Sequence, residues 1–251
     1  MTIESNAITA VAPTSTGSRA TRILGILALA ATVLLALLGL WWTPPDVVQD
    51  ESVRILYIHV PSATLAYVGC FLTTLGSVIY LWKKSQWWEL VAYAAAEIAA
   101  VFTALTLVTG MLWGRITWGV YWQWDARLTT TALLFVSYIG YLAVRNLGGS
   151  HHDRAKRSAI IGLLIVLEIP LVHFSVRLWR SLHQGASVAD PTGDVKMDGL
   201  MLFSLFVGVI AFSLIYVWLL LHRSRTLAMQ DVIDDVGLDR ALAARREEVP
   251  R

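Results

Sequence analysis

The residues best suited to coordination chemistry are two histidines, His59 in "RILYIHVPSA" and His183 in "LWRSLHQGAS". Imidazole binds iron, zinc and copper alike. A zinc site usually takes three or four protein ligands, and neither segment holds a Cys or Met that would favour copper. A porphyrin brings its own nitrogen ligands, so two axial histidines complete the coordination of haem iron. The pair therefore favours haem as the ligand.

An aromatic segment, "WGVYWQWDARLT" (residues 118–129), lies between the two histidines in the sequence. Porphyrin faces are flat and apolar and pack well against aromatic side chains, and the haem propionates need cations, for which arginine is the best partner. The candidate haem-binding residues are therefore the tryptophans and arginines around this segment and before His59, namely Trp113, Trp118, Trp122, Trp124, Arg54 and Arg127.

Each candidate also has an ordinary structural interpretation. Tryptophan is common at membrane interfaces, and a histidine at a helix end is often only a hydrogen-bonded polar residue. Asp125 precedes an apolar run, so it is predicted either to cap a helix or to belong to the site. Arg54 and Arg127 could pair with Asp125, Glu51 or a lipid phosphate. The location of the aromatic segment between two histidines favours the haem interpretation.

The composition is that of a membrane protein. Of the 251 residues, 56% are hydrophobic and only 15% are charged, whereas a soluble domain carries about 25% charged residues. The net charge of +2 gives no reason to expect nucleic-acid binding. Cys70 is the single cysteine, which excludes dithiol chemistry within one chain, and the sequence has no GxxxxGK[ST] phosphate-binding loop.

The apolar residues form blocks long enough to cross a bilayer, which takes about 20 residues in a helix. We predict an all-α integral membrane protein whose six-helix domain covers residues 22–222, with spans at about 23–42, 57–82, 88–113, 128–144, 159–176 and 199–221. A Trp-rich loop is expected at 113–127. Residues 1–21 are predicted to be a disordered leader and 223–251 a charged tail, part of which could form a short amphipathic helix.

Lysine and arginine near span ends set the orientation, because they accumulate on the cytoplasmic side. One set of flanks is the more basic, with Arg19, Arg22, Lys83, Lys84, Arg145, Arg154, Lys156, Arg157, Arg223 and Arg225. Both termini are therefore predicted to be cytoplasmic, which puts His59, His183 and the aromatic segment at the opposite, periplasmic face.

Three ionisable residues lie inside predicted spans: Glu97, Glu168 and His173. Ionisable groups in a membrane are costly and commonly functional. The alternative for the glutamates is a protonated side chain that is hydrogen-bonded to a neighbouring helix. His173 precedes His183 by ten residues and is expected to lie too deep to join a surface site.

The aromatic segment also carries a family resemblance. "WGVYWQWDARLT" matches the pattern WGxxWxWDxRLT of a tryptophan-rich, haem-handling family at every specified position. The six-span layout, with "YIHVP" before the second span and "LHQGA" after the fifth, resembles the haem exporter protein C (cytochrome c maturation protein C, CcmC) family. The resemblance covers the second to the sixth span.

This resemblance implies a protein of the bacterial inner membrane that presents haem b at the periplasmic face, with His59 and His183 as axial ligands and the Trp-rich segment as the haem platform. It implies transient binding and transfer to the periplasmic haem chaperone CcmE. The implied partners are the ABC-type subunits CcmA and CcmB and the small membrane protein CcmD.

The lack of a phosphate-binding loop agrees with an ATPase on another subunit. Whether the protein counts as an enzyme is open, because it could act like a haem lyase by promoting covalent attachment of haem to its chaperone. Two other functions compete with haem delivery: a membrane haem electron carrier, and a haem permease that uses Glu97 and Glu168.

Overall fold

A computed structural model describes residues 14–183 and 197–248 of the chain. Regular structure in these residues is helical, apart from an isolated bridge between Asp46 and Asp50. The elements are α1 (Arg19–Leu37), a π-helical turn (Leu38–Trp42), a 3₁₀ turn (Glu51–Ile55), α2 (Leu56–Lys83), α3 (Gln86–Trp118), α4 (Ala126–Arg145), α5 (His151–Ile165), α6 (Glu168–Leu178) and α7 (Gly199–Glu248).

Six segments of these helices are long and apolar enough to cross a membrane: Arg19–Trp42, Glu51–Lys83, Gln86–Trp118, Ala126–Arg145, His151–Leu178 and Gly199–Asp234. The fifth is made by α5 and α6 together. For the described residues, the prediction of an all-α protein with six helices that are long and apolar enough to span a membrane is thereby confirmed.

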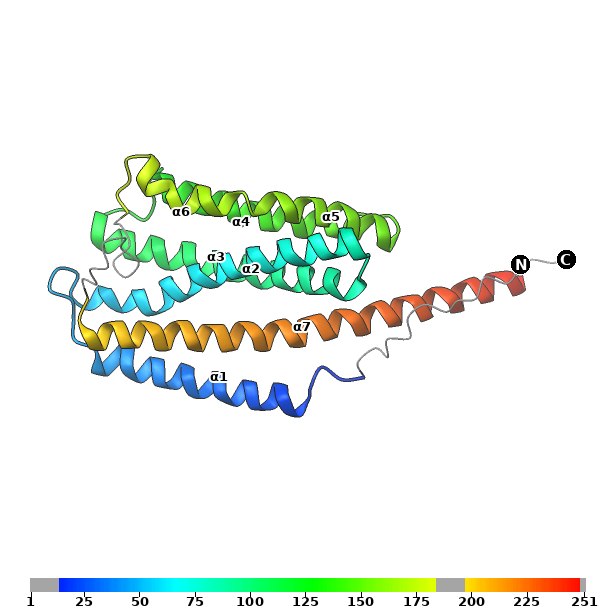
Figure 1. Cartoon of the computed structure of the whole chain (residues 1–251), viewed down its shortest axis with the longest axis horizontal. Helices are drawn as coiled ribbons and strands as arrows, with labels where there is room; N and C mark the ends of the chain where they lie inside the picture. Colours follow the sequence, from blue (N-terminus) through cyan, green and yellow to red (C-terminus); the bar gives the residue numbers. More distant parts are fainter. Residues whose placement is uncertain (1–13, 184–196, 249–251) are drawn as a thin grey trace.

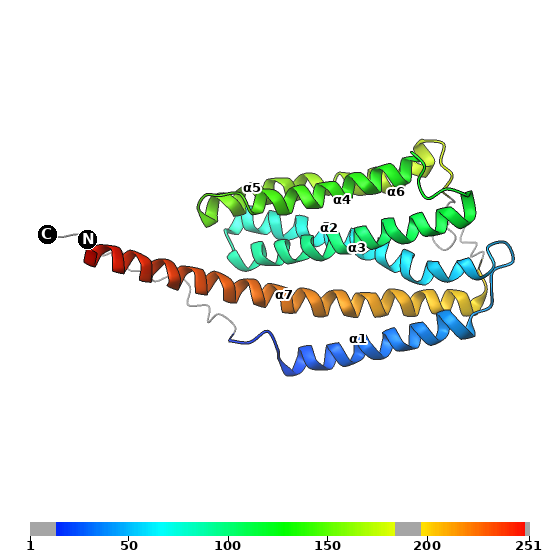
Figure 2. The same cartoon turned by 180° about the vertical axis from the view of Figure 1, so that it is seen from behind.

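The helices run side by side in three groups, as Figures 1 and 2 show from opposite sides. α4, α5 and α6 lie along one side, α2 and α3 lie in the middle, and α7 with α1 lies along the other side. The α3–α4 connection and the starts of α2 and α7 share one end of the bundle. We call it the Trp-rich end, because the connection carries Trp122 and Trp124.

Small residues bring α2 and α3 into close contact. Ala95, Ala96 and Ala99 of α3 are fully buried, and a Cβ atom added to Gly69 of α2 would lie only 2.4 Å from the Cβ of Ala99. Such packing is typical of membrane helices, which gain little from the hydrophobic effect in lipid and associate through van der Waals contact. α2 and α3 therefore form a tightly packed support for the side chains at the Trp-rich end.

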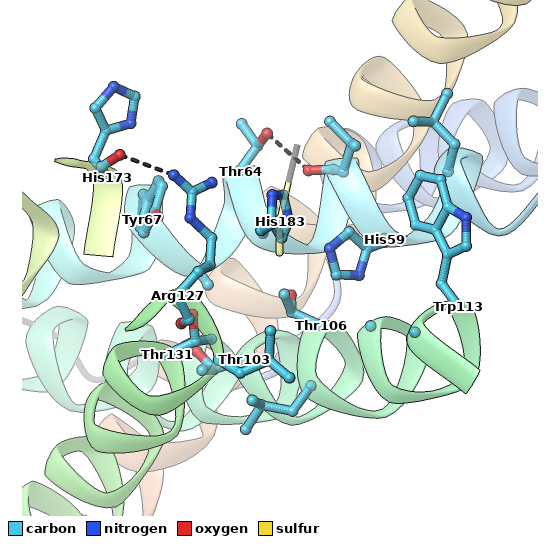
Figure 3. Close-up of a pocket in the computed structure, with 18 of the residues that line it drawn as sticks. His59, Thr64, Tyr67, Thr103, Thr106, Trp113, Arg127, Thr131, His173 and His183 are labelled. Atoms are coloured by element: carbon cyan, nitrogen blue, oxygen red, sulfur yellow. Dashed lines mark hydrogen bonds between the residues drawn. The ribbon is translucent and has the colours of Figure 1, made fainter. Parts of the chain in front are cut away.

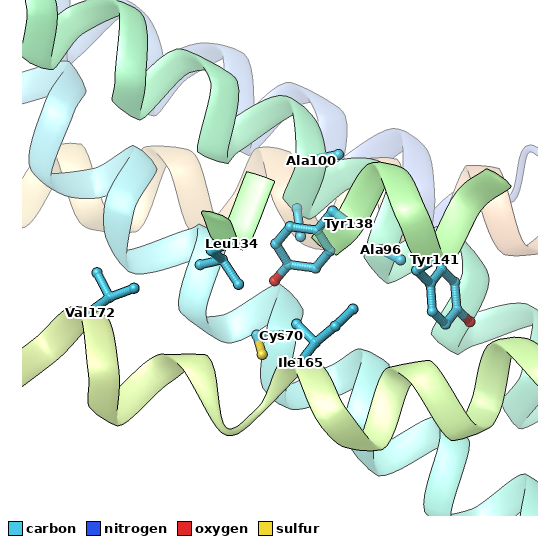
Figure 4. Close-up of a cluster of buried hydrophobic side chains, with 9 residues drawn as sticks. Cys70, Ala96, Ala100, Leu134, Tyr138, Tyr141, Ile165 and Val172 are labelled. Carbon is cyan, nitrogen blue, oxygen red and sulfur yellow. The ribbon is translucent and has the colours of Figure 1, made fainter. Parts of the chain in front are cut away.

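A buried cluster joins this pair to α4, α5 and α6 (Figure 4). Tyr138 of α4 lies at its centre, and its hydroxyl donates a hydrogen bond to the carbonyl oxygen of Ala66 at 2.9 Å. Cys70 is fully buried in the same cluster. The hydroxyl thus has a partner in a region where an unpaired polar group would be costly.

α3 continues past the predicted end of the third span and stops at Trp118. Gly119 follows with a φ of +80°, a left-handed conformation that suits glycine and ends helices. Trp113 and Trp118 therefore lie on a helix, and the segment before α4 is limited to residues 119–125, shorter than the Trp-rich loop expected at 113–127.

The fifth span, predicted as one helix, is interrupted between Ile165 and Glu168. Pro170 explains the interruption. It has no N–H to donate to the carbonyl of Val166, and its ring collides with that carbonyl in a continuous helix. α6 is consequently a separate short helix that leads to the Trp-rich end.

The two ends of the chain also differ from the expected boundaries. α7 continues through the predicted tail to Glu248 and projects past the other helices (Figure 1). α1 begins at Arg19, inside the predicted leader, where Ser18 and Thr21 form a capping box. The rest of the predicted leader, residues 1–13, and residues 249–251 lie outside the described part of the chain.

Two ion pairs join the helices toward the end opposite the Trp-rich end. Arg145 of α4 lies 2.6 Å from Glu89 of α3, and both side chains are almost completely buried. Arg223 of α7 donates to both carboxylate oxygens of Glu97, at 2.5 and 2.7 Å. Glu97 is therefore paired with a cation that lies beyond the predicted end of the sixth span.

Candidate functional site

A cavity of about 440 Å³ lies at the Trp-rich end, between α2, α3, α4 and α7 (Figure 3). Its lining includes five of the predicted site residues: His59, Trp113, Trp118, Arg127 and His183. They come from α2, α3, α4 and the segment that follows α6. Folding thus brings together side chains that are more than 100 residues apart in the sequence.

His59 is oriented by a threonine of α3. Its Nδ1 lies 3.0 Å from the Oγ1 of Thr109, whose hydroxyl donates to the carbonyl of Leu105 at 2.7 Å. Because the hydroxyl proton is directed to that carbonyl, Thr109 accepts from His59, and Nδ1 carries the imidazole proton. The lone pair is then on Nε2, the state that a metal-binding imidazole requires.

Space for this imidazole comes from Gly110. A Cβ atom added to Gly110 would lie 3.0 Å from the Cε1 of His59, so any larger residue would press on the ring. Glycine at this position of α3 therefore allows the histidine of α2 to lie against the helix backbone.

A tryptophan of α3 lies beside each of the two predicted ligands, His59 and His183. The rings of Trp113 and His59 meet edge to face with centroids 5.8 Å apart, and those of Trp118 and His183 do so at 6.5 Å. The indole N–H of Trp113 donates to the Oε1 of Gln49 at 2.7 Å, which holds that ring in place. The cavity thus has aromatic walls next to its two imidazoles.

Of the two arginines predicted to bind the ligand, Arg127 lines the cavity. Its guanidinium donates to the carbonyl of His173 at 2.9 Å and to the hydroxyl of Ser175 at 3.3 Å, which positions it against α6. Arginine has five N–H donors, so further donors are left for a ligand. Within the described residues, no carboxylate forms an ion pair with Arg127.

Asp125 caps α4 and also holds the segment that carries His183. One carboxylate oxygen accepts the Arg127 N–H at 2.8 Å, and the other accepts the Leu182 N–H at 2.8 Å. Burial opposes ionisation of this carboxyl, but hydrogen bonds from Ser181, Leu182 and Arg127 outweigh it and hold its pKa below the ordinary value. Asp125 does not line the cavity, so it acts on the site through its neighbours.

Three other predicted residues lie outside the cavity lining: Arg54, Trp122 and Trp124. Arg54 donates to the carboxylate of Glu51 and to the carbonyl of Gly39, in line with the alternative that it pairs with a nearby acid. Trp122 and Trp124 pack edge to face with centroids 5.6 Å apart, and Trp124 is 83% exposed. These two tryptophans form a surface beside the cavity.

The sequence interpretation missed several residues that line the cavity. Thr103, Thr106, Gly110 and Thr117 lie on the same face of α3 as the predicted Trp113, and this helical spacing was the available signal. His173 also borders the cavity, although it was expected to lie too deep. Its carbonyl faces Arg127, while its imidazole points away in Figure 3.

Glu97 and Glu168 do not line the cavity. Glu97 is paired with Arg223, and Glu168 accepts a hydrogen bond from Ser137 of α4 at 2.5 Å. The second arrangement corresponds to the structural alternative, in which an intramembrane glutamate bonds to a neighbouring helix.

Comparison with known proteins assigns this chain to a family. The family model described as heme exporter protein C matches residues 7–236, which include every cavity residue named above. The chain belongs to the heme exporter protein C family. Relatives named heme exporter protein C occur in Bradyrhizobium diazoefficiens, with 39% identity over 199 residues (78% of this chain and 75% of the relative), and in Escherichia coli K12, with 34% over 209 residues (81% and 82%).

A further relative of the heme exporter protein C family comes from Marchantia polymorpha. It is a putative cytochrome c biosynthesis ccmC-like mitochondrial protein, 39% identical over 158 residues, which are 63% of this chain and 67% of the relative. The similarity therefore extends beyond bacteria.

Proposed function

We propose that this protein binds haem b transiently in the cavity at the Trp-rich end and delivers it to the periplasmic haem chaperone CcmE for cytochrome c maturation. The observation that carries the proposal is that His59 of α2 and His183, which follows α6, line one aromatic cavity. Membership of the heme exporter protein C family supports a role in haem handling. In this proposal the two histidines are the axial iron ligands.

The chemistry of the cavity fits haem better than a bare metal ion. Among the described residues, no group of three or more His, Cys, Asp or Glu could hold a metal. A porphyrin supplies the missing ligands itself, and the rings of Trp113 and Trp118 suit its apolar faces. The unprotonated Nε2 expected for His59 suits iron ligation.

Arg127 is the proposed partner of a haem propionate, because it lines the cavity and keeps donors available. Arg54 remains a second candidate, but it would have to exchange its bond to Glu51 for one to the ligand. Trp122 and Trp124 are proposed to contact the exposed rim of the haem or the approaching chaperone, since they lie on the surface beside the cavity.

We propose further that the Trp-rich end faces the periplasm of a bacterial inner membrane, with both termini in the cytoplasm. The support is the excess of Lys and Arg in the flanks at the other end. The ATPase would reside on CcmA, with CcmB and CcmD as membrane partners. Our chain would then act as a delivery component with no ATPase activity, whose action on CcmE resembles that of a haem lyase.

The spectrum of the purified protein tests this function. Wild-type protein is expected to carry haem with a six-coordinate, bis-histidine Soret spectrum, while His59→Ala and His183→Ala each lose that ligation. His173→Ala is the matched control, because its imidazole points away from the cavity. Unchanged ligation in both cavity variants would refute the axial assignment.

The same variants separate delivery from electron transfer. Haem transfer to CcmE should fail with His59→Ala and His183→Ala and continue with Glu97→Gln and Glu168→Gln, whose side chains lie outside the cavity lining. Loss of delivery in the glutamate variants would instead favour a permease. Stable haem that cycles between redox states and is never transferred would favour an electron carrier.

A further inference from the structure

The cavity reaches well below the membrane surface. Tyr67 and Val209 line it, and they lie eleven residues after the start of α2 and ten after the start of α7, roughly 15 Å along each helix. Exposed Trp41, Trp42 and Trp179 near the Trp-rich end mark the headgroup level, where tryptophan accumulates. The lower part of the cavity therefore lies at the depth of the lipid hydrocarbon.

At this depth the cavity is bordered by two helices that belong to different sides of the bundle. α6 packs against α4 and α5, whereas α7 packs against α1, α2 and α3. His173 of α6 and Phe206 of α7 both border the cavity. Both are exposed, Phe206 to 53%. At these two residues the cavity therefore reaches the outer surface of the helix bundle.

The part of the cavity wall that α7 provides is apolar. Leu205, Phe206 and Val209 line the cavity with no charged residue among them. Arg127 lies on α4, hydrogen-bonded to the carbonyl of His173 on α6. A flat apolar ligand with anionic groups at one edge matches this distribution, since its ring can pass the apolar side chains while its carboxylates approach the guanidinium.

We propose that haem enters the cavity sideways from the bilayer, past the exposed side chain of Phe206 on α7. This inference rests on the proposed function and adds the source of the ligand, which is haem dissolved in the surrounding lipid. Val209 and Phe206 line the entry. The axial histidines lie nearer the membrane surface, so haem moves outward from the lipid to its ligands.

Loading kinetics with two haem sources test this route. Protein reconstituted in phospholipid vesicles receives haem either from haem already dissolved in those vesicles or from haem–albumin in the aqueous phase. Val209→Trp fills the entry and should slow loading from lipid about tenfold, a rise of about 1.4 kcal/mol in the barrier. Loading from albumin should slow far less than loading from lipid, so the ratio of the two rates reports the route, and a wild-type circular dichroism spectrum shows that the variant is folded.

The matched control is Ile210→Trp, since Ile210 is 57% exposed on the same helix but does not line the cavity. Phe206→Ala widens the entry and should speed loading from lipid. Wild-type rates from lipid in both Val209→Trp and Phe206→Ala, or equal slowing from both sources, would overturn the lateral route and leave haem binding intact. A wild-type protein that binds haem from neither source would overturn the proposed function as well.

Discussion

The carboxylate of Asp125 accepts the backbone N–H of Leu182 at 2.8 Å, although the two residues are 57 positions apart. Its other oxygen caps α4 at Arg127. One side chain therefore fixes both the helix that carries Arg127 and the segment that carries His183. Sequence reasoning treated helix cap and site residue as alternatives. The structure shows the cap, and the same carboxylate bonds to the segment that carries His183.

Replacing Asp125 by Ala should remove the cap, at a cost of about 1 kcal/mol, and release the segment before His183. We expect weaker haem retention and a loss of bis-histidine character in the Soret spectrum. Asp198→Ala is the control, because Asp198 accepts the N–H of Leu200 at the start of α7 in the same way. Equal haem loss in both variants would show that Asp125 acts only as a cap.

The stabilisation by Asp125 should depend on pH in one direction only. The folded-state pKa of its carboxyl is lowered, so its contribution is complete above the ordinary value of 3.8 and is lost as pH falls through the lowered value. The stability difference between wild type and Asp125→Asn should stay constant from about pH 7 to about pH 5 and shrink below about pH 4. A difference that already shrinks near neutral pH would contradict this.

Thr109→Val removes the hydrogen-bond partner of His59 Nδ1. The ring should lose its fixed tautomer and orientation, and haem affinity should fall about 10- to 100-fold, as for other second-sphere partners of metal-binding histidines. Titration of the apo-protein with haem measures the change. Thr103→Val is the control, because Thr103 also lines the cavity but bonds to the carbonyl of Ala99.

Gly110→Ala should displace the imidazole of His59, since the new methyl group would lie 3.0 Å from its Cε1. We expect a shifted ligand-field spectrum and faster haem loss with little change in thermal stability. Gly140→Ala on α4, where the added Cβ meets no atom within 4 Å, should leave the spectrum unchanged. An unaltered spectrum in Gly110→Ala would contradict the close contact between Gly110 and the imidazole of His59.

Arg145→Ala should destabilise the protein by about 3–5 kcal/mol, because the buried carboxylate of Glu89 loses its arginine partner and keeps only His151, whose Nε2 lies 3.9 Å away. Denaturation in detergent measures this cost. The change lies far from the cavity, so the haem spectrum of the folded fraction should match wild type. Glu89→Gln in the same background should recover part of the stability by removing the unpaired charge.

Apolar block length predicted the six spans because a helix must bury its backbone hydrogen bonds to cross lipid. Chain order also indicated that His59 and His183 share one end of the bundle, and both line one cavity there. Their ligation of iron stays a prediction. The positions of Trp122 and Trp124 could not be derived, because residues 119–125 have no helical or strand periodicity that assigns side chains to a face.

The remaining differences between the sequence predictions and the structure arise from contacts of particular residues. Arg54 had two expected partners, a haem propionate or a nearby acid, and in the structure it pairs with Glu51, three residues earlier in the chain. The pairing of Glu97 with Arg223 was not predicted, because it depends on the position of α7 relative to α3 along the helix axes. The break before α6 could have been predicted from Pro170, because proline disrupts the helical turn that precedes it.

The unbroken α7 helix has a mechanical consequence. Its 50 residues make a rod about 75 Å long, well beyond the 40–45 Å thickness of a bilayer. One arm carries Leu205, Phe206 and Val209 in the cavity wall, and the other projects past the bundle (Figure 1). If α7 tilts as one rigid rod, the projecting arm and the cavity wall move in opposite directions.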